Sequence, residues 1–385
     1  MWVSPRAARL GAVPGSLTHF SLESYKAFDE PVELELAPLT IVLGRNNAGK
    51  SALVRAPAFA TSGFSNRARR PFDLNPRGQT FGRSLQDCAF DRRLTGLKVG
   101  VQVEGLSVRL AAYEAEDGTQ QLAEAKVGNE TFEKPSWSDV RSSICGHETL
   151  RDLGERIAWL SDERTIRAGQ ADDAPPERLG PEGTGSLAWL HHARRSAQGQ
   201  QNLEALTAWL RKHMGLDLEV RQANGQLECF VRPDNTTAEL HPSQVGSGFR
   251  QLLPVLAALF VDPGEQPAPL LIIEHPELHL HPGLHGEIGE LLLRRALVAE
   301  SPPLLIESHS DALLLRARAL IAEGQASKDD VAVYFVEPQE RGSTVQRIWL
   351  DEAGTPDWWP RGVFAEPTVE FQRIRRALNR GGGAD

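Results

Sequence analysis

The stretch of sequence that decides the fold is Leu39-Thr40-Ile41-Val42-Leu43-Gly44-Arg45-Asn46-Asn47-Ala48-Gly49-Lys50-Ser51. An apolar, β-rich run leads into a loop, Gly44 to Ser51, that matches the pattern G-x-x-x-x-G-K-[ST]. Backbone N–H groups of such a loop, with the positive end of the following helix, bind phosphate oxygens. The sequence therefore predicts a P-loop for a nucleoside triphosphate, in which Lys50 reaches the β- and γ-phosphates and Ser51 holds Mg²⁺.

Composition limits the classes of protein that need to be considered. The chain has 385 residues, 24% charged and 41% hydrophobic, with a formal net charge of −9. It is long enough to bury a sizeable core in one large domain or two ordinary ones. The acidic balance argues against a broadly basic nucleic-acid coat, although Arg67, Arg69 and Arg70 leave DNA open as a partner through a local groove. Solvated faces are the simpler interpretation of such clusters.

The cysteines and the apolar runs bear on location. Cys88, Cys145 and Cys229 are widely spaced and form no CxxC pair, so neither a zinc knuckle nor a disulfide framework is predicted. This usage fits a reducing, cytoplasmic setting. Residues 1–15 lack a continuous apolar segment and are expected to be an N-terminal extension, not a signal peptide. The longest apolar run, 252–261, is far short of the ~20 residues of a membrane span, so no membrane partner is expected.

The hydrophobic pattern predicts an α/β chain with an insertion. Strands are expected at 17–20, 32–36, 39–43, 270–273, 304–306, 331–336 and 344–350. Hairpins are expected at 97–103 with 106–110 and at 216–220 with 227–231. Helices are expected from the P-loop to about Ala60, at 203–213, at 247–260, after the strands 270–273 and 304–306, and at 368–378. Residues 61–95 read as a long functional loop, and 150–160 fit either a helix or a strand.

Three further motifs follow the P-loop in order. Gly246-Ser247-Gly248 opens an apolar helix and offers a second anion site, although N-capping by Ser247 alone is the simpler interpretation. An apolar strand then ends in Glu274, whose carboxylate would hold Mg²⁺ or its water beside the γ-phosphate. A later strand leads to His309, which is either a structural hydrogen-bonder or, in this order of motifs, a γ-phosphate sensor.

The segment between Glu274 and His285 is rich in histidine. It reads Glu274-His275-Pro276-Glu277-Leu278-His279-Leu280-His281-Pro282. No His-x-x-x-His pair encloses a glutamate here and no cysteine accompanies it, so this segment alone does not predict a metal site.

This order of motifs resembles the ATP-binding-cassette (ABC) ATPase heads of the SMC, RecF and OLD type. It is most similar to a group of prokaryotic AAA/ABC-like ATPases whose four motifs correspond to residues 38–51, 245–254, 273–282 and 307–310. The tail 358–364 resembles the W-P-x-G-F-F segment that ends such proteins. The resemblance implies an α/β P-loop NTPase with an antiparallel β subdomain. A single head would cover 16–385, with an inserted helical and hairpin region at about 111–240 and a C-terminal segment at 331–385.

The resemblance also implies a mechanism that needs two copies. In a homodimer, each ATP would lie between the P-loop of one protomer and the signature helix of the other. Gly246, Ser247 and Gly248 would then contact the γ-phosphate in trans, and His309 would be the switch histidine. Residues 278–282 would form the D-loop that touches the partner's site. Gln86 is the candidate for the Gln-loop glutamine, and Gln79 is the alternative.

Two positions depart from this pattern. Gly246 replaces the usual signature serine, with Ser247 one place along. His275 stands where these ATPases carry a catalytic glutamate. An imidazole with an ordinary pKa of ~6.5 is a different base from a carboxylate. Glu277 lies close in sequence and is the alternative base. We therefore expect slow hydrolysis.

These features lead to three hypotheses about function. The first is an ATPase that dimerises on ATP and controls either DNA or an effector protein. The effector would be a nuclease or toxin encoded nearby, and the role would be anti-phage defence or genome maintenance. The second is an ATP-sensing scaffold with negligible hydrolysis, which His275 keeps open. The third is an OLD-like nuclease, which ranks lower because residues 310–385 show no clear acidic metal cluster.

Overall fold

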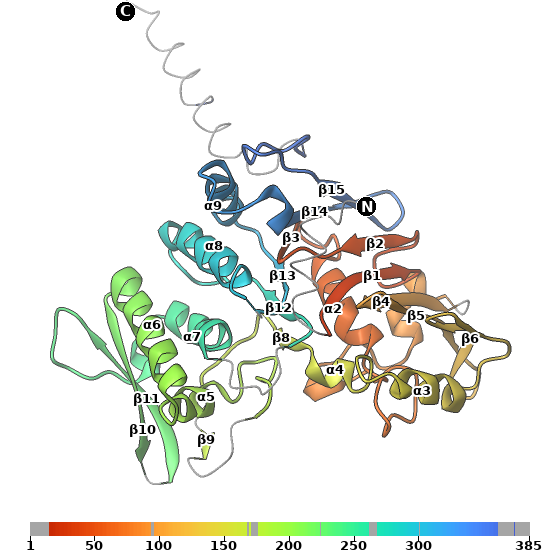
Figure 1. Ribbon diagram of the computed structural model, residues 1–385, viewed down its shortest axis with the longest axis horizontal. Helices are drawn as coiled ribbons and strands as arrows, with labels where there is room; N and C mark the ends of the chain where they lie inside the picture. Colours follow the sequence, from red (N-terminus) through yellow and green to blue (C-terminus); the bar gives the residue numbers. More distant parts are fainter. Residues whose placement is uncertain are drawn as a thin grey trace, which may run out of the picture.

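The computed structural model describes residues 15–93, 96–167, 169–170, 176–223, 225–261, 268–299, 301–360 and 373. In this part of the chain the strands form a central six-stranded sheet, a second six-stranded sheet and a small three-stranded sheet (Figure 1). Apart from residue 373, the predicted helix at 368–378 lies outside the described residues, as do residues 1–14 of the expected extension and residues 361–364 of the tail motif.

The central sheet carries the P-loop strand in its middle. Its spatial order is β15 (Ser343–Ile348), β14 (Val331–Pro338), β3 (Leu39–Gly44), β13 (Leu304–Glu307), β12 (Leu271–Glu274) and β8 (Ala158–Leu160). All neighbours are parallel except β15, which pairs antiparallel at the edge. In the register, Val42 lies opposite Glu307 and Glu307 lies opposite Glu274. The ends of β12 and β13 are therefore level with each other and with Val42, two residues before the P-loop strand ends at Gly44.

Both faces of the central sheet are buried, which explains the continuous apolar runs of its strands. Alternate side chains of β3 enter different cores: Ile41 packs in one and Val42 in the other. The first core contains the helices α7 (Ser247–Phe260), α8 (Pro282–Ala296) and α9 (Asp311–Ala322). The second contains α2 (Lys50–Ala60). The P-loop helix α2 and the predicted signature helix α7 thus lie on opposite faces of the sheet.

The second six-stranded sheet is antiparallel and packs over α2. Its spatial order is β2 (Val32–Glu35), β1 (Leu17–Glu23), β4 (Leu97–Val103), β5 (Leu106–Glu114), β6 (Gln120–Val127) and β7 (Glu130–Phe132). The helix α3 (Trp137–Gly146) covers β6. The sequence pattern did not predict β6, β7 or α3, because few residues of β6 are buried and its outer positions are polar. The loop at 61–95 contains short 3₁₀ turns at Pro76–Gly78, Gln86–Cys88 and Phe90–Arg92.

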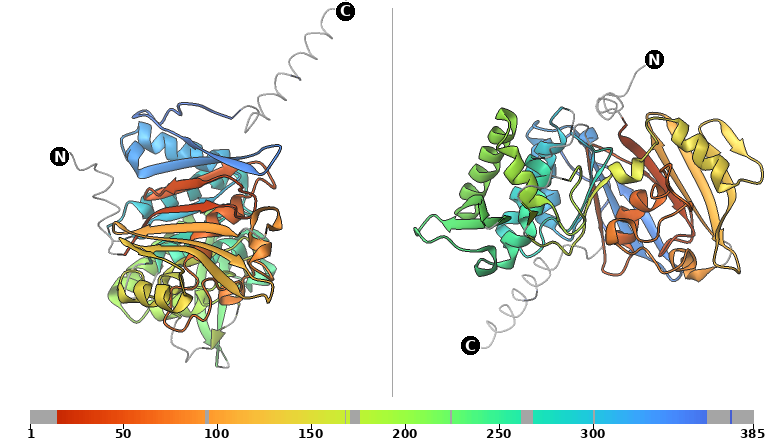
Figure 2. Two further views of the ribbon diagram at one scale, coloured as in Figure 1. Left: turned by 90° about the vertical axis from the view of Figure 1, so that its right-hand side faces the viewer. Right: turned by 90° about the horizontal axis from the view of Figure 1, so that it is seen from below.

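A helical lobe stands at the end of the molecule opposite the antiparallel sheet (Figures 1 and 2). It contains α5 (Ser186–Ala193), α6 (Ala197–Met214), α7 and the sheet β10 (Leu216–Ala223), β11 (Gln226–Pro233) and β9 (Gly169–Gln170). The ambiguous stretch 150–160 divides into α4 (Leu153–Arg156) and strand β8. The domain boundaries expected from the sequence stay predictions. Among the described residues, no helix is both long enough and apolar enough to cross a bilayer.

The packing of the two cores predicts how the cysteines react. Burial raises the pKa of the Cys88 thiol to about 11 and that of Cys229 to about 12. Because the thiolate is the reactive form, we expect iodoacetamide at about pH 8 to leave both thiols unmodified in the folded chain. Mass spectrometry should detect alkylation of both only after denaturation. Rapid modification of Cys229 in the native chain would contradict its buried placement.

Candidate nucleotide-binding site

Two glycines allow the loop between β3 and α2 to turn tightly. Gly44 and Gly49 have φ angles of 154° and 92°. A Cβ at Gly44 would lie 2.3 Å from the carbonyl oxygen of Val336, and one at Gly49 would lie 2.7 Å from the Cβ of Ala27. Any larger residue would therefore displace the loop. No side chain caps the N-terminus of α2, so the backbone N–H groups of its first turn are free to bind an anion.

Lys50 lies inside this loop and is only 4% exposed. Its Nζ donates a hydrogen bond to the carbonyl oxygen of Arg45, at 2.8 Å. Burial lowers the pKa of Lys50, and the nearby charge of Glu307 opposes this effect. The ammonium group is thus held across the turn that would enclose a phosphate.

The acid that contacts the P-loop serine is Glu307, at the end of β13. Ser51 Oγ donates to Glu307 Oε1 at 3.1 Å. Although burial raises the pKa of the Glu307 carboxyl, the hydrogen bonds from His275 and Ser51 and the charge of Lys50 outweigh burial and lower it. The candidate residues chosen from the sequence did not include Glu307. A signal was nevertheless present, because β13 is an apolar strand ending in an acid, as is β12.

Glu274, at the end of β12, is instead held by two residues that the sequence did not single out. Arg55 on α2 forms a bidentate ion pair with its carboxylate, with Nε 2.7 Å from Oε1. Trp159 Nε1 donates to the same Oε1 at 2.7 Å. Burial raises the pKa of Glu274, and the Arg55 hydrogen bond opposes that rise. Its predicted role at Mg²⁺ would therefore require Arg55 to release it.

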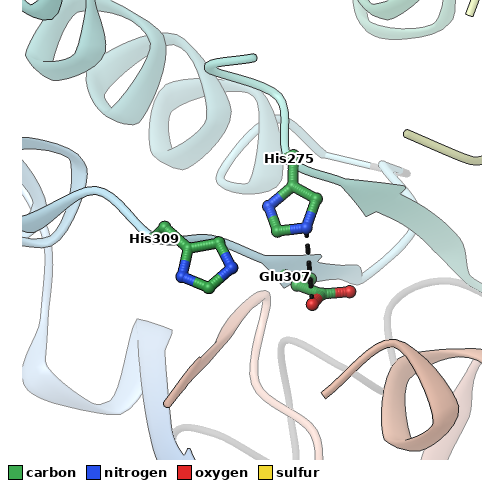
Figure 3. Close-up of side chains that lie close together, drawn as sticks. All are labelled: His275, Glu307 and His309. Carbon is green, nitrogen blue, oxygen red and sulfur yellow. Dashed lines mark ion pairs between the residues drawn. The ribbon is translucent and has the colours of Figure 1, made fainter. Parts of the chain in front are cut away.

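Figure 3 shows the imidazoles of His275 and His309 side by side next to Glu307. Their rings are stacked, with centroids 4.9 Å apart, and His275 Nε2 lies 3.4 Å from Glu307 Oε1. Burial lowers the pKa of His275, but the hydrogen bond and charge of Glu307 outweigh it, so the net shift is upward. Burial together with the charges of Lys50 and His275 lowers the pKa of His309.

Glu277 holds the turn that carries His309. Its Oε1 accepts hydrogen bonds from Ser308 Oγ and from the backbone N–H of His309, each at 2.9 Å. The side chain is 7% exposed. Glu277 is therefore anchored to the end of β13, while its role as an alternative base stays a prediction.

A buried arginine, Arg164, joins the helical lobe to the end of β12. Its guanidinium donates to the carbonyl oxygens of His275, at 2.8 Å, and of Gln251 on α7, at 2.9 Å. Burial lowers the pKa of this group to about 10. No local sequence signal marks Arg164, because its partners come from segments far along the chain. Its side chain therefore connects α7 to the backbone of His275 through hydrogen bonds.

The structure brings together Lys50, Ser51, Glu274, His275, Glu277 and His309, but it places the predicted signature residues elsewhere. Gly246 and Ser247 are exposed at the start of α7, on the other face of the central sheet. Gly248 packs against the carbonyl oxygen of His279, in the predicted D-loop. Gln86 donates its side-chain amide to the Arg92 carbonyl, inside its own loop. The roles of these residues stay predictions.

The sheet order, the glycine-rich loop and the acids at the neighbouring strand ends give this chain the fold of the P-loop ATPase heads of the SMC type. Residues 229–316 match the family model described as "AAA domain, putative AbiEii toxin, Type IV TA system". No curated protein matches the chain.

Solved structures share the fold at low sequence identity. An Smc head bound to the C-winged helix domain of ScpA is 15% identical, with a TM-score of 0.54, over 88% of this chain and 99% of that one. The Smc head with an extended coiled coil and the C-terminal domain of ScpA, derived from Pyrococcus furiosus, is 14% identical, with a TM-score of 0.51, over 94% and 99%. The Smc head with a coiled coil and joint, derived from Pyrococcus yayanosii, is 11% identical, with a TM-score of 0.50, over 88% and 98%.

The Arg55–Glu274 pair yields a prediction about stability. Arg55→Ala leaves a fully buried carboxylate without its cation, and we expect it to lower the free energy of unfolding by about 3 kcal/mol. Adding Glu274→Gln should restore part of this loss, because it removes the unpaired charge. The measurement is denaturant unfolding of each variant. Arg341→Ala, which removes an exposed partner of Asp29, is the control and should cost less than about 1 kcal/mol. Equal losses in the two arginine variants would contradict the assignment.

Proposed function

We propose that this chain is an ATPase that dimerises around ATP and uses binding and slow hydrolysis to drive a partner effector or a DNA transaction. The observation that carries this proposal is the placement of α2 and α7 on opposite faces of the central sheet. The P-loop therefore lacks a signature helix from its own protomer, while Gly246 and Ser247 are exposed. A second copy facing the first would supply the missing wall of each site.

Within one protomer, different residues would bind different parts of the nucleotide and its metal ion. Lys50 would exchange the Arg45 carbonyl for β- and γ-phosphate oxygens, and the free N–H groups of α2 would bind the same oxygens. Ser51 fits a role as a Mg²⁺ ligand, and Glu274 is the acid expected from the sequence. When bound, the cation would offset the charge of the phosphates and polarise them. His309 would sense the γ-phosphate, because it follows the strand next to the P-loop strand.

The conformational change that accompanies ATP binding and hydrolysis would be transmitted to a partner. Two of the similar Smc heads are bound to a domain of ScpA, which supports a partner protein docking on this head as well. The description of the matching family model names a toxin of a toxin–antitoxin system. We propose that the partner is an effector encoded nearby, a nuclease or a toxin, in anti-phage defence or genome maintenance. Arg164 gives a route for such coupling, because it connects α7 to the backbone of His275.

A second candidate, an ATP-sensing scaffold with negligible hydrolysis, is favoured by two observations. By the family resemblance, His275 stands where these ATPases carry a catalytic glutamate, and in the structure Glu274 is engaged by Arg55 and Trp159. In this form ATP would close the dimer without being consumed quickly. The measured turnover decides between the two candidates.

Binding and dimerisation can be tested together. We expect Lys50→Ala to lose ATP binding, measured with a fluorescent ATP analogue, because it removes the cation that faces the phosphates. Ser247→Arg should retain ATP binding but block the ATP-dependent dimer, measured by light scattering. Lys212→Ala, at an exposed position on α6, is the matched control and should behave as wild type. A wild-type chain that stays monomeric with ATP would refute the dimer.

Hydrolysis depends on which residue serves the attacking water. We expect His275→Ala to lower kcat by about 100-fold while ATP affinity stays unchanged. Glu277→Gln keeps the oxygen that accepts from Ser308 and His309 and removes only the charge. It should retain most of the activity if Glu277 is an anchor, and lose about as much as His275→Ala if Glu277 is the base. Steady-state phosphate release measures both, and full activity in both variants would show that neither residue is needed.

A further inference from the structure

The ends of β12 and β13 gather three side chains whose donor atoms suit a metal ion. One ligand atom each from His275, Glu307 and His309 lies within 4.8 Å of the others. We propose that this group binds a divalent transition-metal ion of the Mn²⁺ class beside Ser51, with Glu307, not Glu274, as its carboxylate ligand. The function of this metal rests on the proposed ATPase function, whereas its binding requires no nucleotide.

Glu307 has unused capacity to bind a cation. Its side chain is 2% exposed, and Oε1 accepts the hydrogen bond from Ser51. Its second oxygen, Oε2, is buried and has no hydrogen-bond partner among the described residues. An unpaired carboxylate oxygen in such a place is costly, so the fold tolerates it best where a ligand completes the site.

Glu274 has no such capacity. Both of its oxygens are bound by Arg55, and Oε1 also accepts from Trp159. The positive charge of Arg55 already offsets its negative charge at close range. A cation could use Glu274 only by breaking the bidentate pair and leaving the Arg55 guanidinium without a partner. Of the two acids at these strand ends, Glu307 is therefore the available one.

The backbone aims His275 at Glu307. His275 has a φ of 45°, a left-handed conformation that is strained for a residue with a side chain. Its backbone N–H donates to the carbonyl oxygen of Glu307 at 2.9 Å, which fixes the turn after β12. The imidazole consequently lies over the carboxylate, as Figure 3 shows. His309 lies on the exposed side of the group, so an ion can enter there.

The chemistry of the donors limits the class of metal that fits. Ligand atoms held at about 2.0 to 2.2 Å from one ion lie about 3 to 4 Å apart, so small side-chain movements would close the group. Two imidazoles favour a transition metal over Mg²⁺, which prefers oxygen ligands throughout. The carboxylate, the Ser51 hydroxyl and the open side toward the phosphates add oxygen donors, and this mixture suits Mn²⁺. On this assignment His275 supports hydrolysis as a ligand, not as the general base.

The test uses the full, metal-stripped chain without nucleotide, titrated with Mn²⁺ and followed by the EPR signal of the free ion. Wild type should bind one Mn²⁺ with ¹⁴N couplings in pulsed EPR, and a large excess of Mg²⁺ should be needed to displace it. Glu307→Gln, His275→Ala and His309→Ala should each weaken binding by about 10-fold or more. Glu274→Gln should change it by less than about 3-fold. The exposed His147→Ala is the matched control and should leave it unchanged.

His309→Ala keeps the test decisive if a buried variant fails to fold, because His309 is exposed. Absence of Mn²⁺ binding, binding without nitrogen couplings, or a greater loss in Glu274→Gln than in Glu307→Gln would overturn the proposal. Wild type that binds Mn²⁺ with the expected variant pattern but does not bind ATP would support the metal site while refuting the proposed function.

Discussion

The in-register parallel pairing of β3, β13 and β12 is the constraint on which the rest of the site depends. It sets Val42 opposite Glu307 and Glu307 opposite Glu274, so three chain segments end at one edge of the sheet. The P-loop, both acids and both histidines meet there for this reason. Because side chains alternate between the two faces of a strand, a shift of one residue would turn Glu307 away from Ser51.

Buried charge is balanced at this edge by residues from four different segments. Lys50 and Arg55 come from α2, and Arg164 follows β8, while the acids end β12 and β13 or follow them. Arg55 compensates Glu274, and Arg164 binds backbone carbonyls of both β12 and α7. Movement of the helical lobe would therefore act on the backbone of His275. This arrangement makes the edge a junction between the two cores as well as the candidate binding site.

Much of the fold could be predicted from the sequence because its signals are local. The apolar runs of β3, β12 and β13 follow from burial on both faces, and the hairpins follow from alternation and turn residues. The sequence did not predict β6, β7 or α3, since a strand buried at few positions resembles a polar loop. The ambiguity at 150–160 was real, because a short helix and a short strand share that stretch.

The sequence by itself determined the P-loop, because glycine spacing, Lys50 and Ser51 act within one strand–loop–helix unit. It also indicated that strand ends carrying acids and histidines complete the site. Only the tertiary structure decided which acid contacts Ser51, because Glu274 and Glu307 end similar apolar strands and differ only in their neighbours. Arg55 and Trp159 hold the first, and His275 and Ser51 contact the second. Such partners come from distant segments, and their choice depends on how the strands are ordered across the sheet.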